Sequence, residues 1–252
     1  MWQKIAKIVV PKDLSEGGAE TEVFSPPSAC IKESNIMIEE KYKAVVLGAG
    51  ESGVGAALLY QSRGISVFVS DYGSIAPKYK EELEEHGIPY EEGCHSTDLI
   101  LRSEEIVKSP GIPEKAPIMQ AVRAQGIPVI SEIELAGRYL RGKAIGITGS
   151  NGKTTTTMWL HHILSEAGMK VGLAGNVGFS LARQVITEDQ PDYFVIELSS
   201  FQLDDMHDFR VHIALLMNIT PDHLDRYHYN FEEYALAKMR ILQNQTSEDA
   251  FI

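Results

Sequence analysis

The stretch Gly146–Thr157, which reads GITGSNGKTTTT, decides the fold of this chain. The apolar run Ala144–Ile147 enters it as an expected strand, and the helical pattern Met158–Ala167 leaves it. A glycine-rich turn between a strand and a helix supplies backbone N–H groups and a helix N-terminus, and both attract phosphate. The sequence therefore predicts a phosphate-binding loop in an α/β protein.

The residue types in this loop point to ATP. Glycines at 149 and 152 let the backbone approach a phosphate without a Cβ in the way. Lys153 can reach the β- and γ-phosphates, and the Thr154 hydroxyl can ligate Mg²⁺. The general pattern GxxxxGK[ST] is incomplete, because its first glycine falls at Ile147. The predicted ATP-binding residues are those of the shorter loop: Gly149, Ser150, Asn151, Gly152, Lys153, Thr154 and Thr155.

Bulk composition restricts the class of protein. A length of 252 residues suffices for two domains with cores of their own. The formal charge of −12, with no basic stripe, argues against a nucleic-acid partner. No apolar run approaches the roughly 20 residues of a membrane span, so no membrane insertion is expected. Residues 1–40 show no sustained period and are interpreted as a flexible extension.

From Lys43 onward, expected strands and helices alternate, which predicts a doubly wound parallel sheet. Before the loop, strands are expected at 43–48, 67–70, 106–108 and 128–130, and helices at 52–62, 78–87, 116–125 and 132–140. After the loop helix, strands are expected at 170–173, 193–198 and 213–218, and a helix at 231–244.

This order predicts a Rossmann-like domain over 41–141 and a P-loop α/β ATPase domain over 142–252. The final residues, DAFI, begin another expected buried strand. The second sheet is therefore expected to be incomplete, and the chain to be part of a longer protein.

The first domain carries a nucleotide-binding pattern. Residues 48–53 read GAGESG, and Asp71 ends the next strand, where it can bond a ribose hydroxyl. The pattern supports a nucleotide diphosphate but does not distinguish NAD from UDP, and a purely structural turn remains an alternative. Ser109 and Gly111 end the third strand and face the same crevice.

Polar residues beside the phosphate loop predict a metal site. Glu197 ends a very apolar strand, where a carboxylate sits in the place of a Mg²⁺ ligand. His223 follows the next strand end between two aspartates, and its position at the same edge favours ligation over a surface role. Three neutral polar residues lie near these strand ends and can contact substrate: Asn176, Ser199 and Gln202.

Lys238 lies on the apolar face of the expected helix 231–244, which leaves two interpretations. Burial would lower the pKa of its amine, and a neutral amine reacts with CO₂ to form a carbamate, an oxygen ligand for a metal. Alternatively, the stem packs on the apolar face and the charged head reaches water. The residues alone favour the second interpretation.

The assembled segments resemble those of the Mur ligases. They are GITGSNGKTTTT, GNVG, ELSSFQL, NITPDHLDRY and YALAKMRIL in order, preceded by GAGESG and KSPG. The resemblance covers residues 43–252, and ELSSFQL with NITPDHLDRY points to the members that add D-glutamate. It implies a monomeric, cytoplasmic, ATP-dependent and ADP-forming amide ligase of peptidoglycan synthesis. The implied substrates are UDP-N-acetylmuramoyl-L-alanine, D-glutamate and ATP.

The resemblance also implies the roles of individual residues. The family phosphorylates the substrate carboxylate, and the amine of D-glutamate attacks the acyl phosphate while two Mg²⁺ ions neutralise charge. Lys153 and Thr154 would hold the γ-phosphate and the first ion, of which Glu197 would be a further ligand. His223 and a carbamylated Lys238 would hold the second ion.

For the first domain the resemblance implies UDP binding. The implied contacts are Gly50, Glu51, Ser52, Asp71, Tyr72 and Gly111. Relatives often carry Thr and Arg after the aspartate, whereas this chain has Tyr72 and Gly73.

The family has a C-terminal domain that contacts ATP and carries most of the D-glutamate site, and these 252 residues are not expected to include it. The chain alone is therefore expected to bind the UDP substrate without completing the ligation. Two other interpretations stay open: an NAD(P)-binding module fused to a P-loop ATPase, and an inactive truncated ligase. A folate polyglutamylating ligase is disfavoured, because it lacks the GAGESG domain.

Overall fold

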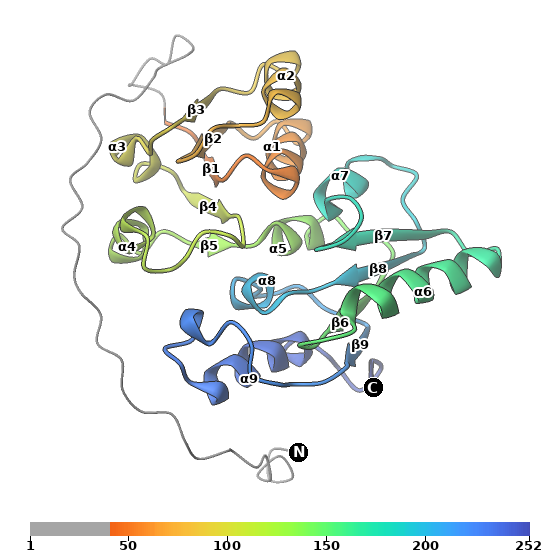
Figure 1. Ribbon diagram of the computed structural model, residues 1–252. Helices are drawn as coiled ribbons and strands as arrows, with labels where there is room; N and C mark the ends of the chain where they lie inside the picture. The colour runs from red at the N-terminus through yellow and green to blue at the C-terminus, as the bar shows by residue number, and fades with distance from the viewer. Residues whose placement is uncertain (1–40) are drawn as a thin grey trace.

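The computed structural model describes residues 41–252, and the expected extension over 1–40 lies outside the described residues. Figure 1 shows two sheets, one above the other, with helices on both faces. The first sheet has the order β3-β2-β1-β4-β5 and the second β10-β9-β6-β8-β7. Every strand pair in both is parallel, which confirms the predicted α/β class.

The strands of the first sheet are β1 (Ala44–Leu47), β2 (Val67–Asp71), β3 (Tyr90–Glu92), β4 (Glu105–Lys108) and β5 (Val129–Ile130). Those of the second are β6 (Lys143–Thr148), β7 (Val171–Gly175), β8 (Tyr193–Glu197), β9 (Ile213–Leu216) and β10 (Ala250–Phe251). The inner strands β1 and β8 are apolar runs buried along almost their whole length, as expected where helices cover both faces of a parallel sheet.

The helices around the first sheet are α1 (Glu51–Ser62), α2 (Pro77–Glu85), α3 (Thr97–Ile100), α4 (Pro117–Ala124) and α5 (Glu132–Gly137). Those of the second part are α6 (Lys153–Glu166), α7 (Leu181–Ile186), α8 (Ser200–Asp204) and α9 (Phe231–Met239), with 3₁₀ turns η2 (Leu224–Arg226) and η3 (Arg240–Leu242). None of the helices within 41–252 is long and apolar enough to cross a bilayer.

The glycine that ends the GAGESG motif sets how closely α1 packs on the first turn. A Cβ added at Gly53 would lie 1.8 Å from the carbonyl oxygen of Gly48. Only a residue without a side chain permits this approach, so the motif is required by the backbone packing itself.

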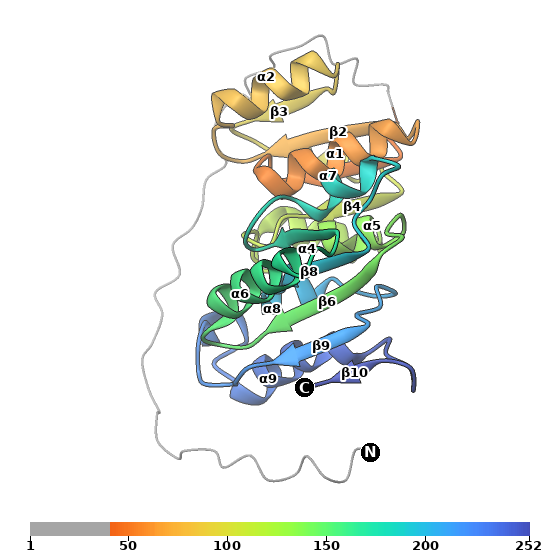
Figure 2. The ribbon, with the colours of Figure 1, turned by 90° about the vertical axis from the view of Figure 1, so that its right-hand side faces the viewer.

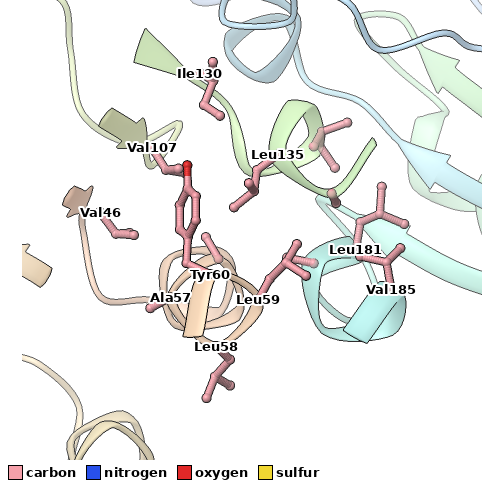
Figure 3. Packing of buried hydrophobic residues seen from close by; sticks show 14 of the residues in the cluster. Val46, Ala57, Leu58, Leu59, Tyr60, Val107, Ile130, Leu135, Leu181 and Val185 are labelled. Atoms are coloured by element: carbon pink, nitrogen blue, oxygen red, sulfur yellow. The ribbon is translucent and has the colours of Figure 1, made fainter. Parts of the chain in front are cut away.

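The two sheets share one hydrophobic core. Leu59 of α1 packs in the same cluster as Leu181 and Val185 of α7 and Leu135 of α5. Figure 3 shows these side chains between α1, α5 and α7, with Val46 of β1 on the other side of α1. Because this layer joins helices from both halves of the chain, it also fixes one sheet relative to the other.

Some elements differ from expectation. β3, α7 and α8 are short and were not predicted, because three to six residues carry too little periodicity to be recognised. The expected helix 231–244 ends at Met239 and continues as a 3₁₀ turn. The expectation of a buried strand at DAFI is wrong in one respect: β10 pairs with β9, but both of its residues are exposed.

The carboxyl ends of the strands face one side of the molecule. In Figure 2 the arrowheads of β2, β6 and β9 all point to the same side. Loops that follow parallel strands at this edge are where α/β proteins bind ligands. The predicted site residues of both domains therefore lie on one side.

Candidate active site

The phosphate loop joins β6 to α6 and has the backbone that its glycines allow. Gly149 has a φ of 143° and Gly152, the N-cap of α6, a φ of 84°, values that favour glycine. A Cβ on Gly149 would also lie 3.0 Å from Cβ of Met217. The loop therefore requires glycine at both positions.

A second segment, 218–220, supports the loop from behind. The backbone N–H of Ser150 donates to the carbonyl of Asn218, and that of Asn151 to the Asn218 side-chain oxygen, both at 2.9 Å. The Ser150 hydroxyl donates to the Thr220 carbonyl at 2.8 Å and lies 2.9 Å from the hydroxyl of Tyr234. Contrary to the expectation of a continuous row of phosphate donors, these two N–H groups face the protein.

The donors that remain for a phosphate belong to the first turn of α6, whose first N–H groups have no partner within the helix. Thr154 and Thr155 are exposed in this turn. Lys153 lies folded back, with its Nζ donating to the Ser150 carbonyl at 2.9 Å. The side chain is half-buried and needs only a rotamer change to leave that carbonyl for an anion.

Glu197 combines deep burial with an unpartnered oxygen. It ends β8 beside Ile147 of β6 and is 1% exposed. Its Oε1 accepts a hydrogen bond from Nδ2 of Asn176 at 2.8 Å, while Oε2 has no partner among the described residues. A buried carboxylate oxygen without a donor is costly unless a cation meets it, so this residue fits a Mg²⁺ ligand.

The amine of Lys238 is buried against the start of the phosphate loop. The residue is 2% exposed, its Nζ donates to the carbonyl of Gly149 at 2.8 Å, and it lies 4.7 Å from the ring centroid of Tyr234. Burial, with the nearby charge of Lys153, lowers the pKa of Lys238 to about 8. The interpretation that this head group reaches water is therefore wrong.

His223 precedes η2 in the segment that follows β9, and its backbone is strained. Its φ is 49°, and His228 and Tyr229 in the same segment are also left-handed, at 50° and 56°. Such strain in residues other than glycine gathers at functional sites. The ring is exposed, 3.6 Å from Oδ2 of Asp222 and 5.6 Å from the ring centroid of Phe201.

Across residues 41–252, no three His, Cys, Asp or Glu side chains gather as a ready metal site. An ion here can also take oxygens from water, from threonine, from phosphate or from a modified lysine. His223 and Lys238 remain predicted ligands of a second ion.

In the first domain, Asp71 holds the nucleotide turn together. Its Oδ2 accepts from the N–H of Ala49 and its Oδ1 from the N–H of Gly73, both at 2.7 Å. Gly50 is the N-cap of α1, and Ser52 lies in the first turn of that helix. The predicted turn is thus formed, and both carboxylate oxygens of Asp71 accept backbone N–H groups.

Glu51 faces the second half of the chain. Its Oε1 lies 3.0 Å from Nε of Arg183 and 3.3 Å from the backbone N of Ser180, and its Oε2 accepts from the hydroxyl of Tyr79 at 3.3 Å. Arg183 also pairs with Glu82 of α2. These contacts give Glu51 a part in holding α7 against the first domain.

Three further predicted residues surround the same turn. Tyr72 is 48% exposed, with its ring centroid 5.7 Å from that of His95. Ser109 packs on Gly48, to whose carbonyl its hydroxyl lies within 3.4 Å. Gly111 borders open space, because an added Cβ would meet no atom within 4 Å.

Ser199 and Gln202 have a structural use here. The Ser199 hydroxyl accepts from the N–H of Gln202, whose side chain accepts from the N–H of Ser199, and together they form the capping box of α8. Gln202 is buried. Their predicted contacts with substrate remain predictions.

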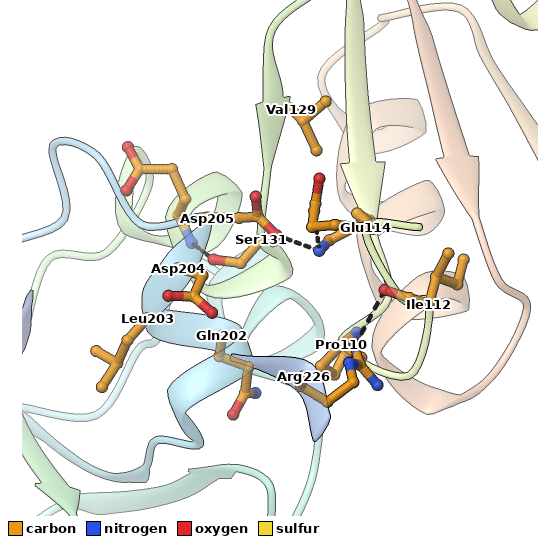
Figure 4. Close-up of polar contacts among 12 residues, drawn as sticks. Pro110, Ile112, Glu114, Val129, Ser131, Gln202, Leu203, Asp204, Asp205 and Arg226 are labelled. Atoms are coloured by element: carbon orange, nitrogen blue, oxygen red, sulfur yellow. Dashed lines mark hydrogen bonds and ion pairs between the residues drawn. The ribbon is translucent and has the colours of Figure 1, made fainter. Parts of the chain in front are cut away.

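A pocket of about 200 Å³ separates the first sheet from α8. Nζ of Lys108 lies 2.7 Å from Oε1 of Glu114 and 2.8 Å from Oδ2 of Asp205, whose Oδ1 lies 2.8 Å from Arg123. Although burial acts to raise the pKa of Glu114, hydrogen bonds from Arg123 and Lys108 lower it to about 2. Figure 4 shows Glu114, Asp205 and Arg226 around this pocket.

Sequence reasoning missed several residues that the structure places at the site: Asn218, Thr220, Tyr234 and Arg226. Asn218, Thr220 and Arg226 lie in NITPDHLDRY, and Tyr234 lies in YALAKMRIL, two of the segments quoted above. No signal distinguished their roles, because each acts on residues about 70 positions away or more.

The family comparisons agree with this arrangement. The model described as "Mur ligase MurD-like, N-terminal domain" matches residues 42–131, and "Mur ligase middle domain" matches 147–252. A solved structure described as a UDP-N-acetylmuramate:L-alanyl-gamma-D-glutamyl-meso-diaminopimelate ligase from Neisseria meningitides has a TM-score of 0.57 at 22% identity. The two overlap over 84% of this chain and 71% of that one, which shows a shared fold.

Curated relatives are closer in sequence. A protein of Porphyromonas gingivalis named UDP-N-acetylmuramoylalanine--D-glutamate ligase is 66% identical over 84% of this chain and 47% of its own length. One of Bacteroides fragilis with the same name is 61% identical over 83% of this chain and 47% of its own length. The chain thus spans about half the length of these relatives. On these matches, the chain belongs to the Mur ligases, as a MurD-like N-terminal domain followed by a middle domain.

Proposed function

We propose that this chain forms the UDP-substrate site and the ATP site of a ligase that adds D-glutamate to UDP-N-acetylmuramoyl-L-alanine in peptidoglycan biosynthesis. Relatives of that name are 66% identical over most of the chain. The observation that carries the proposal is that Glu197 and Lys238, both buried, flank one phosphate loop. Because the chain spans about half of those relatives, turnover by the chain alone is not expected.

In this proposal the loop positions the γ-phosphate for transfer to the carboxylate of the UDP substrate. Lys153 leaves the Ser150 carbonyl to pair with the phosphate, and the first turn of α6 donates its free N–H groups. Thr154 and the open oxygen of Glu197 would hold Mg²⁺, which neutralises charge between the two anionic reactants. The amine of D-glutamate then attacks the acyl phosphate, and phosphate leaves.

Lys238 is proposed to carry a carbamate, which with His223 would hold a second ion. A neutral amine forms the N–C bond to CO₂ and releases one proton, and a pKa near 8 leaves about a tenth of the amine neutral at pH 7. The hydrogen bond to the Gly149 carbonyl keeps the group beside the loop.

The nucleotide part of the substrate is assigned to the first domain, within the proposed boundaries 41–141, and ATP to 142–252. Gly50, Ser52 and Asp71 line the turn, and Ser109 and Gly111 lie on its far side. We further propose that the protein is a cytoplasmic monomer, which sedimentation velocity would test for the oligomeric state.

Calorimetric titration with UDP-N-acetylmuramoyl-L-alanine, with NAD as control, tests this function. Saturable binding of the UDP compound and none of NAD is the expected result. Binding of NAD alone would refute the assignment and favour a dinucleotide module fused to an ATPase. A parallel titration with a non-hydrolysable ATP analogue, with and without Mg²⁺, tests the second site separately.

A further inference from the structure

Arg226, at the end of η2, joins three segments that lie far apart in the chain. Its Nη2 donates to the carbonyl oxygens of Pro110 and Ile112, both at 3.3 Å. Its guanidinium carbon lies 4.4 Å from the ring centroid of Phe201 in α8. Figure 4 shows Arg226 reaching the loop that carries Pro110 and Ile112.

These contacts fix the direction of one backbone donor, together with a β-turn in which the N–H of Ile112 donates to the Ser109 carbonyl at 3.1 Å. In a trans peptide the C=O and the following N–H point in opposite directions, and residues 41–252 contain no cis peptide. With the Pro110 carbonyl held by Arg226, the N–H of Gly111 must therefore point away from the guanidinium. The peptide after Ile112 contributes no donor, because the next residue is Pro113.

The Gly111 N–H is free to meet a ligand. Among the described residues no carbonyl or side chain accepts from it. An added Cβ on Gly111 would meet nothing within 4 Å, so the space around it is open. The loop follows β4 next to β1, where the order of the first sheet reverses, and such a reversal is where α/β sheets place their ligands.

We propose that Arg226 is a positioning residue for the UDP-linked substrate: by holding the Pro110 carbonyl, it directs the Gly111 N–H at an anionic oxygen of the nucleoside diphosphate. The inference rests on the proposed function of the first domain. Arg226 belongs to the same segment as Thr220 and His223, so it also links the substrate crevice to the support of the phosphate loop.

Four single variants of the 252-residue chain and one double variant, titrated with UDP-N-acetylmuramoyl-L-alanine, test the proposal. Arg226→Met removes the donor but keeps an apolar stem over Phe201, and Arg226→Lys keeps one donor for Pro110. Gly111→Pro removes the N–H, whereas Gly111→Ala retains it and is the matched control. Gly111→Ala is compatible with the backbone, since Gly111 does not have a left-handed φ. Gly111 is the third residue of a turn in which the N–H of Ile112 donates to the Ser109 carbonyl at 3.1 Å, so Gly111→Pro also strains that turn, and its thermal unfolding is measured alongside its affinity.

Loss of one N–H bond to a charged oxygen should weaken affinity about 10- to 100-fold. We expect that loss for Arg226→Met and for Gly111→Pro, and near wild-type affinity for Arg226→Lys and Gly111→Ala. The double variant Arg226→Met/Gly111→Pro should bind no more weakly than Gly111→Pro, because both act through the same donor. Affinity for a non-hydrolysable ATP analogue should change less than about twofold.

The proposal would be overturned if the loss of affinity in the double variant equalled the product of the two single losses. Wild-type affinity of Arg226→Met for the UDP compound would also overturn it. Thermal unfolding of each variant identifies misfolding, and the Gly111 pair decides the question even where Arg226→Met does not fold. Equal affinity of Gly111→Pro and Gly111→Ala then refutes it. Failure of the unmodified chain to bind the UDP compound would instead contradict the proposed function.

Discussion

Replacing Lys238 by methionine is expected to stabilise the fold at pH 7 while removing the amine that the proposed carbamate requires. Burial and the charge of Lys153 lower the pKa of Lys238 from 10.5 to about 8. The folded protein thus holds this proton less tightly than the unfolded chain does, so the charged amine opposes folding. The opposition is complete below pH 8 and disappears as the pH rises from about 8 to 10.5.

The size of the effect follows from the pKa and from one hydrogen bond. A pKa lowered by about 2.5, at 1.36 kcal/mol for each unit, corresponds to about 3 kcal/mol of destabilisation at pH 7. Methionine is close in shape and uncharged, but it loses the 2.8 Å hydrogen bond from the charged amine to the Gly149 carbonyl, which contributes about 2 kcal/mol. The net gain is about 1 kcal/mol, or roughly 2–4 °C in Tm for a chain of this size.

Urea unfolding followed by circular dichroism, at pH 7, 9 and 10.5, measures this gain. Buffers free of CO₂ prevent carbamate formation, and Lys115→Met, a change at an exposed lysine, serves as the control. The difference in unfolding free energy between Lys238→Met and wild type should fall steadily across this range and reach zero or change sign by pH 10.5.

A variant that is less stable than wild type at pH 7 would refute the reasoning. A gain that does not depend on pH would refute it as well, because the stabilisation would then come from packing and not from removal of a buried charge.

Three other changes follow from the same contacts. Glu197→Gln should weaken the Mg²⁺-dependent binding of an ATP analogue at least about 10-fold, because the buried, unpartnered carboxylate oxygen loses its charge. An equal loss of affinity without Mg²⁺, measured by calorimetry, would contradict this. Glu134→Gln should lower stability by about 2–3 kcal/mol in urea unfolding, because the carboxylate accepts from the three backbone N–H groups of 207–209 at 2.9–3.0 Å. Gly53→Ala should unfold the first domain or lower its stability by more than about 3 kcal/mol, because the added Cβ would lie 1.8 Å from the carbonyl oxygen of Gly48. Gly50→Ala is the control: its Cβ would meet nothing within 4 Å, so its Tm in a thermal melt should stay near that of the unmodified chain.

Local sequence was sufficient for the parallel sheets and the phosphate loop. The inner strands β1 and β8 are apolar runs buried on both faces, and the glycines at 149 and 152 lie where the backbone needs a positive φ. These features depend on residues close together in the sequence and on whether a strand is buried, and both can be predicted from composition and residue spacing. The position of Glu197 at the end of its strand could be predicted for the same reason.

Tertiary structure decided the state of Lys238 and the partners of Arg226. The lysine amine bonds a carbonyl 89 positions earlier, and the pKa of about 8 arises from burial that only the packed helix produces. Arg226 reaches carbonyls 114 and 116 positions away, across the boundary between the two sheets. Contacts over such separations depend on how the sheets pack through α1, α5 and α7. No local pattern in the chain predicts these contacts, because each of them forms only when the packed core brings the two segments together.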